Sequence, residues 1–200
     1  MKFFESSSLS YEPLVRINEW IEEAVKLEVP LPHAMNLSTT NDIGQPSSRM
    51  VLLKSISDEG MVFYTDYESH KGQMLPKNSK AALNFWWAKT DKQIRIQGVC
   101  IKIPEKKSDE YFQSRPRGSQ ISATISFQSK EIKSYSDLVQ EAEDLDKRAS
   151  ESDLGRPARW GGYLLVPNRI EFWNNESNRL HKRELFTLES IKWKKTLLSP

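Results

Sequence analysis

The chain has 200 residues and a mass of 23.2 kDa, the size of one ordinary domain. Hydrophobic residues make up 38% of it, enough for a folded core, so wholesale disorder is excluded. The 29 Lys and Arg residues nearly balance the 27 Asp and Glu residues, which argues against a general polyanion-binding protein. A single cysteine, Cys100, permits no intramolecular disulfide. With no signal-peptide pattern and no apolar run of membrane-spanning length, we expect a single-domain cytoplasmic protein.

The N-terminal residues are rich in serine and lack periodicity, so we predict a mobile arm over residues 1–11 and one domain over residues 12–200. Apolar residues then recur at helical spacing from Leu14 to Val25, with charged residues on the other face. This pattern predicts an amphipathic helix over residues 13–28.

Residues 34–104 have the composition of β-strands separated by polar turns. The runs 49–54 and 61–65 flank a turn, so we predict that they pair as a hairpin. The runs 81–87 and 93–103 predict a second pair, in which apolar and polar residues alternate. Sequential strands with short turns favour an antiparallel meander or barrel over a parallel sheet.

The second half of the chain predicts helices first and strands afterwards. Helical composition extends over residues 107–150, and the acidic stretch 137–153 is typical of a solvated helix face. Further strands are expected at 162–166, 169–173, 183–188 and 191–195. The sequence therefore predicts a mainly β protein with helices (α+β), built as a small antiparallel barrel flanked by helices.

The densest polar cluster of the sequence lies at residues 179–183. In an extended segment, Arg179, His181 and Arg183 would share one face, because alternate side chains of a strand point the same way. Guanidinium groups offer forked donors for a phosphate and a flat surface for a ring. Spacing alone is equally consistent with a solvent-facing basic strand.

Two shorter basic clusters precede it in the chain. In a regular strand over residues 49–54, Arg49 and Lys54 would serve opposite faces and therefore different ligand groups, although Lys54 could instead extend to water. The Ser-His-Lys-Gly segment at residues 69–72 could cradle a phosphate or simply cap a helix.

A fourth cluster combines a phenol, a guanidinium and a hydroxyl. Tyr111 and Arg115 lie four residues apart and would share a helix face, and Ser119 could cap the next helix. This set describes a phosphate pocket, and it also describes an ordinary surface turn.

Other chemistries have little support in the sequence. The three histidines are far apart and form no metal-binding pair, so no metal site is expected. No nucleophile elbow, Walker loop or dinucleotide fingerprint occurs. Cys100 shares the apolar strand face of Ile94 and Ile96, which predicts a core thiol.

Taken together, these clusters resemble the pyridoxine (pyridoxamine) 5′-phosphate oxidase family over residues 12–200. The resemblance rests on segments in matching order and spacing: RMVLLK (49–54), GMVFYTDYESHKG (60–72), QIRIQG (93–98), YFQSRPRGSQ (111–120), QS (128–129), WGGY (160–163) and IEFWNNESNRLHKR (170–183). It implies a split-barrel oxidase that uses flavin mononucleotide (FMN) and works as a homodimer with the flavin at the subunit interface. Such an enzyme oxidises pyridoxine or pyridoxamine 5′-phosphate to pyridoxal 5′-phosphate, and O2 is reduced to H2O2.

The resemblance also implies roles for individual residues. The FMN contacts would be Arg49, Met50, Val51, Leu52, Leu53, Lys54, Tyr64, Thr65, His70, Lys71, Gln93, Gln128, Ser129, Trp173 and Arg183. The substrate phosphate would contact Lys54, Tyr111, Arg115 and Ser119. Arg179 and His181 would bind the pyridine ring and act as the catalytic residues.

The sequence departs from the family pattern at three places. His70 stands where a second cation is usual, which predicts weaker or pH-sensitive binding of the flavin phosphate. Lys182 replaces the usual acid beside His181, which predicts a change in how that ring is oriented. The N-terminal arm lacks the R-x-x-Y element with which many members cover the substrate.

Two alternatives to a vitamin B6 phosphate oxidase are considered. One is a related FMN-dependent oxidase of another reduced ring, as in phenazine biosynthesis, whose members tend to lose the substrate-phosphate residues. The other is a flavin-binding split-barrel protein without oxidase activity. The presence of Lys54, Tyr111 and Arg115 favours a phosphorylated substrate, and the presence of Arg179 and His181 favours an enzyme.

Overall fold

The structure is a computed structural model and describes residues 5–149 and 154–200. Residues 1–4 of the predicted N-terminal arm, and residues 150–153 of the acidic stretch, lie outside the described residues. The described part of the arm contributes β1 (Glu5–Ser6), which pairs in parallel with β4 (Ser55–Ser57). The mobility of the arm stays a prediction.

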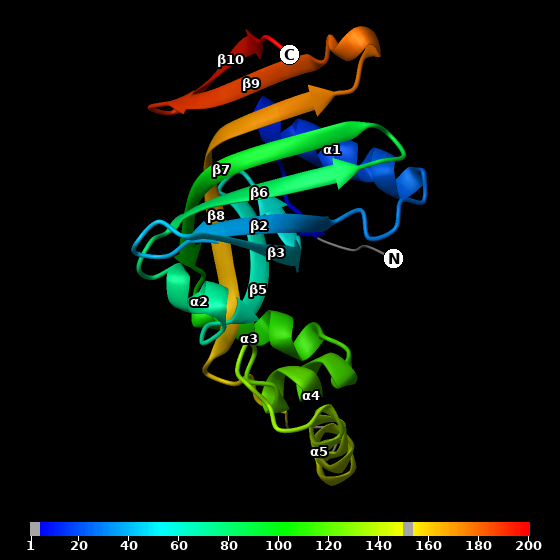
Figure 1. Ribbon diagram of the computed structural model, residues 1–200, viewed down its shortest axis with the longest axis vertical. Coiled ribbons are helices and arrows are strands. Elements are labelled where there is room, and N and C mark those ends of the chain that lie inside the picture. The colour runs from blue at the N-terminus through cyan, green and yellow to red at the C-terminus, as the bar shows by residue number, and fades with distance from the viewer. Residues whose placement is uncertain (1–4, 150–153) are drawn as a thin grey trace.

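Most of the described chain forms one curled sheet with helices at its edges (Figure 1). Its main path is β1-β4-β5-β8-β7-β6-β2-β3, and β9 and β10 continue from β8. The other strands are β2 (Ala34–Thr40), β3 (Pro46–Leu52), β5 (Gly60–Asp66), β6 (Lys80–Trp87), β7 (Lys92–Lys102), β8 (Trp160–Asn174), β9 (Lys182–Glu189) and β10 (Lys192–Leu198). Apart from β1–β4, the pairings of the described strands are antiparallel. The predicted fold class, a mainly β split barrel with flanking helices, is confirmed.

The first helix, α1 (Glu12–Lys26), confirms the predicted amphipathic helix and ends two residues before the expected position. Leu14, Ile17 and Ile21 are at most 1% exposed and belong to the same core as the inner face of the sheet. The Trp20 ring packs edge-on against Phe172 of β8, with ring centroids 5.0 Å apart. The apolar stripe of α1 therefore closes one side of the barrel core.

The predicted strand pair β6 and β7 is also confirmed. Ile94 and Ile96 of β7 are fully buried, whereas Arg95 and Gln97 are exposed, as the alternating pattern predicts. Cys100 lies on the buried face, and its burial raises the pKa of the thiol to about 12, so this cysteine is a core residue.

Two predicted strand arrangements were wrong. Residues 49–52 do not pair with residues 61–65, because β3 pairs with β2, and β5 pairs with β4 and β8. At the end of the run 49–54, the Lys54 N–H does donate to the Val62 carbonyl oxygen at 2.9 Å. The expected strands 162–166 and 169–173 are one continuous strand, β8. Its first half pairs with β5 and its second half with β9, while β7 runs along its other edge. This division of β8 between two partners opens the barrel on one side.

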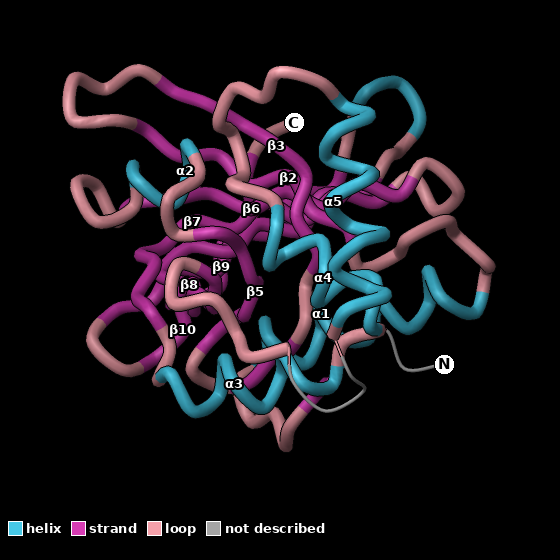
Figure 2. Tube along the Cα trace, turned by 90° about the horizontal axis from the view of Figure 1, so that it is seen from below, coloured by secondary structure: helices cyan, strands magenta, loops and turns pink. Residues whose placement is uncertain are grey.

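Three further helices lie beyond one end of the sheet: α3 (Glu105–Ser114), α4 (Arg117–Ile125) and α5 (Tyr135–Arg148). Both views place α4 between α3 and α5 (Figure 1, Figure 2). They share a small core with β8 that contains Phe112, Ile121 and Trp160. None of the described helices is both long and apolar enough to cross a membrane.

Candidate functional site

We define the inner basic cluster as Arg49, Thr65, Ser69, Lys71 and Gln128, which come from four separate segments of the chain. Lys71 lies in the short helix α2 (His70–Met74) and is 7% exposed. Its ammonium group donates three hydrogen bonds, to Gln128 Oε1 at 2.7 Å, Thr65 Oγ1 at 3.0 Å and Ser69 Oγ at 3.4 Å. All three acceptors are neutral, so these bonds leave the positive charge uncompensated.

The sequence just before Lys71 explains how the lysine reaches this position. Ser69 is the N-cap of α2, and its Oγ accepts a hydrogen bond from the Gly72 N–H at 3.3 Å. A Cβ atom at position 72 would lie 2.3 Å from the Tyr67 carbonyl oxygen, so glycine is needed for α2 to start this close to β5. The capping interpretation of residues 69–72 is confirmed, and the same turn brings Lys71 beside Thr65.

The second cation of this cluster is Arg49, from β3. Its guanidinium donates to neutral groups of β2 and β3, including Thr39 Oγ1 at 2.8 Å and Ser47 Oγ at 2.8 Å. Burial, followed by the charge of Arg49, lowers the pKa of Lys71 to about 8, while the Asp66 carboxylate acts in the opposite direction. Two adjacent cations with neutral hydrogen-bond partners fit an anionic ligand such as a phosphate.

We define the aromatic basic cluster as Lys54, Tyr64, Tyr111, Arg115 and Trp160. The Tyr64 ring stacks on Tyr111 with centroids 4.0 Å apart and on Trp160 with centroids 5.2 Å apart. The Arg115 guanidinium lies 4.5 Å from the Trp160 ring centroid, and Lys54 Nζ lies 5.9 Å from the Tyr111 ring centroid. The stacked rings therefore carry two cations at their edges.

Arg115 has a buried nitrogen, Nη1, without a hydrogen-bond partner. Burial lowers the pKa of Lys54, and the charge of Arg115 lowers it further. Burial also lowers the pKa of Arg115 itself. An unpaired buried donor costs free energy, so an anion bound between these two cations would relieve both the unmet bond and the repulsion.

Ser119 lies half-buried in the first turn of α4. The expectation that it caps a helix was wrong, because Pro116 is the N-cap and the Ser119 N–H donates to the Pro116 carbonyl oxygen at 2.8 Å. The expectation that Tyr111 and Arg115 share a helix face was wrong, because α3 ends at Ser114 and Arg115 has an extended backbone. The two side chains nevertheless interact, since Tyr111 is one of the groups that influence the pKa of Arg115.

We define the C-terminal group as Trp173, Arg179, His181 and Arg183. The Trp173 and His181 rings lie 4.6 Å apart, and Trp173 pairs in register with Gln93 on one side and Arg183 on the other. Nε of Arg183 donates to the buried Glu171 at 2.8 Å. Glu171 also pairs with Arg95, and these two arginines lower the pKa of its carboxyl against the effect of burial.

The expectation that Arg179, His181 and Arg183 share the face of one strand was wrong for Arg179. Residues Ser177–Arg179 form a 3-10 turn, and β9 begins only at Lys182. Arg179 has a φ of 61° and is exposed, and Asn178 before it has a φ of 57°. Nδ1 of His181 accepts a hydrogen bond from the Glu176 N–H at 3.3 Å across this turn. The conformation of this turn, rather than the alternation of side chains along a strand, therefore orients the Arg179 side chain.

The other predicted FMN-contacting residues differ in exposure. Met50 and Leu52 are exposed on the outer face of β3, and Val51 is half-buried on the opposite face. Leu53 is fully buried, and its N–H donates to the His33 carbonyl oxygen at 2.9 Å. Two more, His70 and Ser129, are exposed beside the inner basic cluster.

One chain does not bring all predicted site residues together. The inner and aromatic basic clusters include residues of α2 and α3, two helices that lie in the lower half of Figure 1. The C-terminal group lies at the start of β9 and the end of β8, at the upper end of the same view. The structure therefore presents two separate surfaces, each with part of the predicted set.

Sequence reasoning assigned no role to two residues that support these clusters. Trp160 lies under Arg115, and Arg159 bonds to carbonyl groups of Ala123, Thr124 and Ser126. The WGGY segment contains Trp160, so this segment is the signal that could have identified it. The partners of Arg159 are 33 to 36 positions away in the sequence, and no local pattern indicates such contacts.

Comparisons with known proteins agree with this architecture. Residues 21–148 match the family described as pyridoxamine 5′-phosphate oxidase, and residues 160–200 match the pyridoxine 5′-phosphate oxidase C-terminal dimerisation region. The chain is 43% identical to a pyridoxine/pyridoxamine 5′-phosphate oxidase of Nostoc sp. over 94% of its own length and 88% of the relative. It is 44% identical to a pyridoxine/pyridoxamine 5′-phosphate oxidase 2 of Hydrogenovibrio crunogenus, with the same coverage.

Two solved structures share the fold. The crystal structure of PhzG from Burkholderia lata 383, in complex with tetrahydrophenazine-1-carboxylic acid, superposes with a TM-score of 0.91 at 32% identity, covering 96% of this chain and 94% of that one. An FMN-binding protein from Nostoc punctiforme, 17% identical with a TM-score of 0.78, shares the fold over 97% of this chain and 100% of its own. The chain therefore belongs to the pyridoxamine 5′-phosphate oxidase family of FMN-dependent oxidoreductases, which form homodimers through the C-terminal region.

Proposed function

We propose that the protein oxidises pyridoxine 5′-phosphate or pyridoxamine 5′-phosphate to pyridoxal 5′-phosphate. In this reaction O2 accepts the electrons and gives H2O2, and the amine substrate also releases ammonia. The observation that carries the proposal is the unpartnered, buried Nη1 of Arg115 beside Lys54 and Tyr111. Relatives named as pyridoxine/pyridoxamine 5′-phosphate oxidases, 43% and 44% identical over most of the chain, support the same substrate class.

The aromatic basic cluster would bind the substrate phosphate. Lys54 and Arg115 would neutralise its charge, and the Tyr111 hydroxyl would donate a hydrogen bond, with Ser119 in the adjacent turn. The phosphate takes no part in the oxidation itself. Its binding fixes the position of the pyridine ring, so remote binding energy is used to orient the reacting carbon.

The inner basic cluster would bind the FMN phosphate. Its fit rests on two cations, Arg49 and Lys71, that bond to neutral partners in the described chain. Bound FMN supplies the acceptor for the hydride that leaves the substrate. The protein would orient the two ring systems face to face and exclude water between them.

The C-terminal group would complete the site from the other subunit, with FMN at the interface. The C-terminal dimerisation region includes Trp173, Arg179, His181 and Arg183, and in one chain it lies away from the phosphate clusters. Arg179 and His181 would contact the substrate ring, and Trp173 and Arg183 would contact FMN. A twofold axis then makes two equivalent sites, each built from both chains.

Anaerobic mixing tests this proposal directly. The FMN-loaded protein is mixed with pyridoxine 5′-phosphate without oxygen, and the flavin absorbance near its visible maximum is followed. We expect rapid bleaching with the phosphorylated substrate and little bleaching with pyridoxine at the same concentration. Equal bleaching with both compounds would rule out the phosphate pocket, and no bleaching with either would rule out this substrate class.

A second candidate is an oxidase of another reduced ring, and the TM-score of 0.91 with PhzG favours it. That protein was crystallised with a tetrahydrophenazine carboxylic acid, which carries no phosphate. The same stopped-flow measurement with this compound separates the two candidates. Bleaching by the phenazine compound and not by pyridoxine 5′-phosphate would replace the first proposal with the second.

A further inference from the structure

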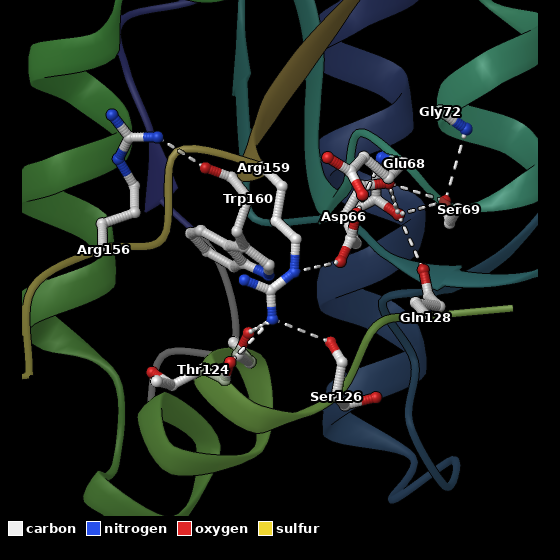
Figure 3. A network of polar contacts seen from close by, with 12 residues as sticks. Asp66, Glu68, Ser69, Gly72, Thr124, Ser126, Gln128, Arg156, Arg159 and Trp160 are labelled. Carbon is white, nitrogen blue, oxygen red and sulfur yellow. Dashed lines mark hydrogen bonds and ion pairs between the residues drawn. The ribbon is translucent and has the colours of Figure 1, made fainter. Parts of the chain in front are cut away.

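Arg159 lies directly before β8 and binds two segments that are distant in sequence. Its Nε forms an ion pair with Asp66, at the end of β5, at 3.1 Å. Its Nη2 donates to the carbonyl oxygens of Ala123 (3.0 Å), Thr124 (2.7 Å) and Ser126 (3.1 Å). Figure 3 shows this side chain between Asp66 on one side and Thr124 and Ser126 on the other.

These contacts fix the chain where α4 ends. The last carbonyl groups of a helix lack partners within the helix, and Arg159 supplies a charged donor for them. The Arg159 guanidinium also lies 4.1 Å from the centroid of the Phe127 ring. The side chains of Arg159 and Asp66 are only 13% and 5% exposed, so the ion pair is shielded from water.

The segment held in this way leads directly to Gln128, two residues after Ser126. Gln128 itself is exposed and lies in no helix or strand, so its backbone position depends on what fixes the preceding residues. Its side-chain oxygen nevertheless accepts hydrogen bonds from Lys71 and Thr65 in the inner basic cluster. On the other side, the same arginine is paired with Asp66, the residue next to Thr65.

We infer that Arg159 is a positioning residue for the FMN phosphate: it fixes the end of α4 against β5 so that Gln128 orients the Lys71 ammonium group. The inference rests on the proposed location of the FMN phosphate in the inner basic cluster. It adds a residue that does not touch FMN and acts through Gln128.

The chain offers a matched control in Arg156, three residues earlier. Arg156 also pairs with a carboxylate, Asp109, at 2.6 Å, and it also donates to a backbone carbonyl, that of Trp160, at 2.6 Å. Its side chain is 8% exposed, close to the value for Arg159. Among the described residues, Arg156 forms no hydrogen bond to the α4–Gln128 segment, so its loss should leave FMN binding unchanged.

The test is a double-mutant cycle on FMN affinity, measured by quenching of FMN fluorescence as apoprotein is added. We expect Gln128→Ala and Arg159→Met each to raise the Kd for FMN about tenfold, because each disturbs a hydrogen bond to a charged group. In the double variant, Arg159→Met should raise the Kd for FMN by less than about twofold over that of Gln128→Ala, because its effect is transmitted through Gln128. Arg156→Met should bind FMN like the wild type.

Arg159→Lys keeps the positive charge opposite Asp66. It serves as a second variant if Arg159→Met does not fold. Its single ammonium group cannot reproduce the planar guanidinium fork, so we expect an FMN affinity between those of the wild type and Arg159→Met. The inference would be overturned if both Arg159 variants bound FMN with wild-type affinity, or if Arg156→Met weakened FMN binding as much as Arg159→Met. It would also be overturned if the effects of Arg159→Met and Gln128→Ala on the Kd for FMN were independent. An unchanged Kd in Gln128→Ala would overturn the proposed FMN location together with it.

Discussion

The inner and aromatic basic clusters differ from the C-terminal group in how much of each site a single chain forms. Lys71 is buried and held by three hydrogen bonds, and Arg115 is packed against Trp160. Arg179, in contrast, is exposed in a turn where two consecutive residues have positive φ values. One chain therefore builds the two basic clusters by itself, whereas in our proposal the second subunit supplies the surroundings of Arg179.

This difference has a physical reason. A phosphate is recognised by donors at fixed positions, and buried side chains on strands and short helices give such positions at little entropic cost on binding. The reacting ring must instead be enclosed between two surfaces that exclude water. In a symmetric dimer the second surface can come from the partner, so each chain needs to carry only half of the enclosure.

The largest effect is expected from Arg179→Ala. Loss of a charged donor at the reacting ring should lower kcat by about 100- to 1,000-fold, while the Kd for FMN changes by less than about twofold. Steady-state kinetics and FMN titration measure the two quantities. Leu180→Ala, in the same exposed turn, is the control and should retain near wild-type turnover. A wild-type rate in Arg179→Ala would remove this residue from the site.

Mixed dimers distinguish a site shared between subunits from a site within one chain. We mix Arg179→Ala protein with the Lys54→Met/Arg115→Met double variant and allow subunits to exchange. About half of the dimers should then be mixed, each with one intact site. Assayed at a substrate concentration near the wild-type KM, where both parents are nearly inactive, the mixture should recover about a quarter of wild-type activity. Activity no higher than that of the parents, with exchange shown by mass spectrometry, would place both groups in the same subunit's site.

Removal of one phosphate-binding cation should affect substrate affinity more than turnover. Arg115→Ala should raise the KM for pyridoxine 5′-phosphate about tenfold with little change in kcat, because the phosphate is remote from the reacting carbon. The matched control is Arg117→Ala, two residues later, whose side chain pairs with Asp146 of α5. An unchanged KM in Arg115→Ala would be incompatible with the aromatic basic cluster as the phosphate site.

The smallest expected effect is on the pH dependence of FMN binding. The pKa of Lys71 in the ligand-free protein is about 8, so its charge is present below that pH and is lost above it. The Kd for FMN should therefore rise several-fold between about pH 7.5 and 9.5, with bound phosphate moving the midpoint upward. Fluorescence titrations of Lys71→Met should show weak binding without this dependence. The same slope in Lys71→Met would assign it to another group.

Local patterns predicted the elements whose burial repeats along the chain. The apolar residues at helical spacing in α1 and the alternating apolar and polar residues in β7 each predicted one buried face, and the structure confirms both. Apart from Ser69 and Trp160, the resemblance also indicated the residues of the inner and aromatic basic clusters, which the structure brings together from separate segments. Their roles as ligands for FMN and substrate stay predictions that the experiments above test.

Patterns failed where distant segments decide the conformation. Pro167 and Asn168 have the composition of a turn, yet β8 continues through them because β7 changes register between Gln97 and Gly98. A Cβ atom at Gly98 would lie 2.1 Å from the Val166 carbonyl oxygen, so this irregularity needs glycine on the neighbouring strand. Nothing within residues 160–174 themselves reports that requirement.

The sequence by itself determined the family, the barrel with its flanking helices, and which side chains are candidates to bind phosphate. The family came from motifs whose order and spacing resemble a known family, and the helices and strands came from periodicity, and both are properties that the chain carries before it folds. Only the tertiary structure decided that Arg179 lies in a turn, that the C-terminal group lies apart from the two basic clusters, and that Arg159 binds the carbonyl groups at the end of α4. These features depend on strand register and on contacts between segments far apart in the chain, which are fixed only when the sheet closes.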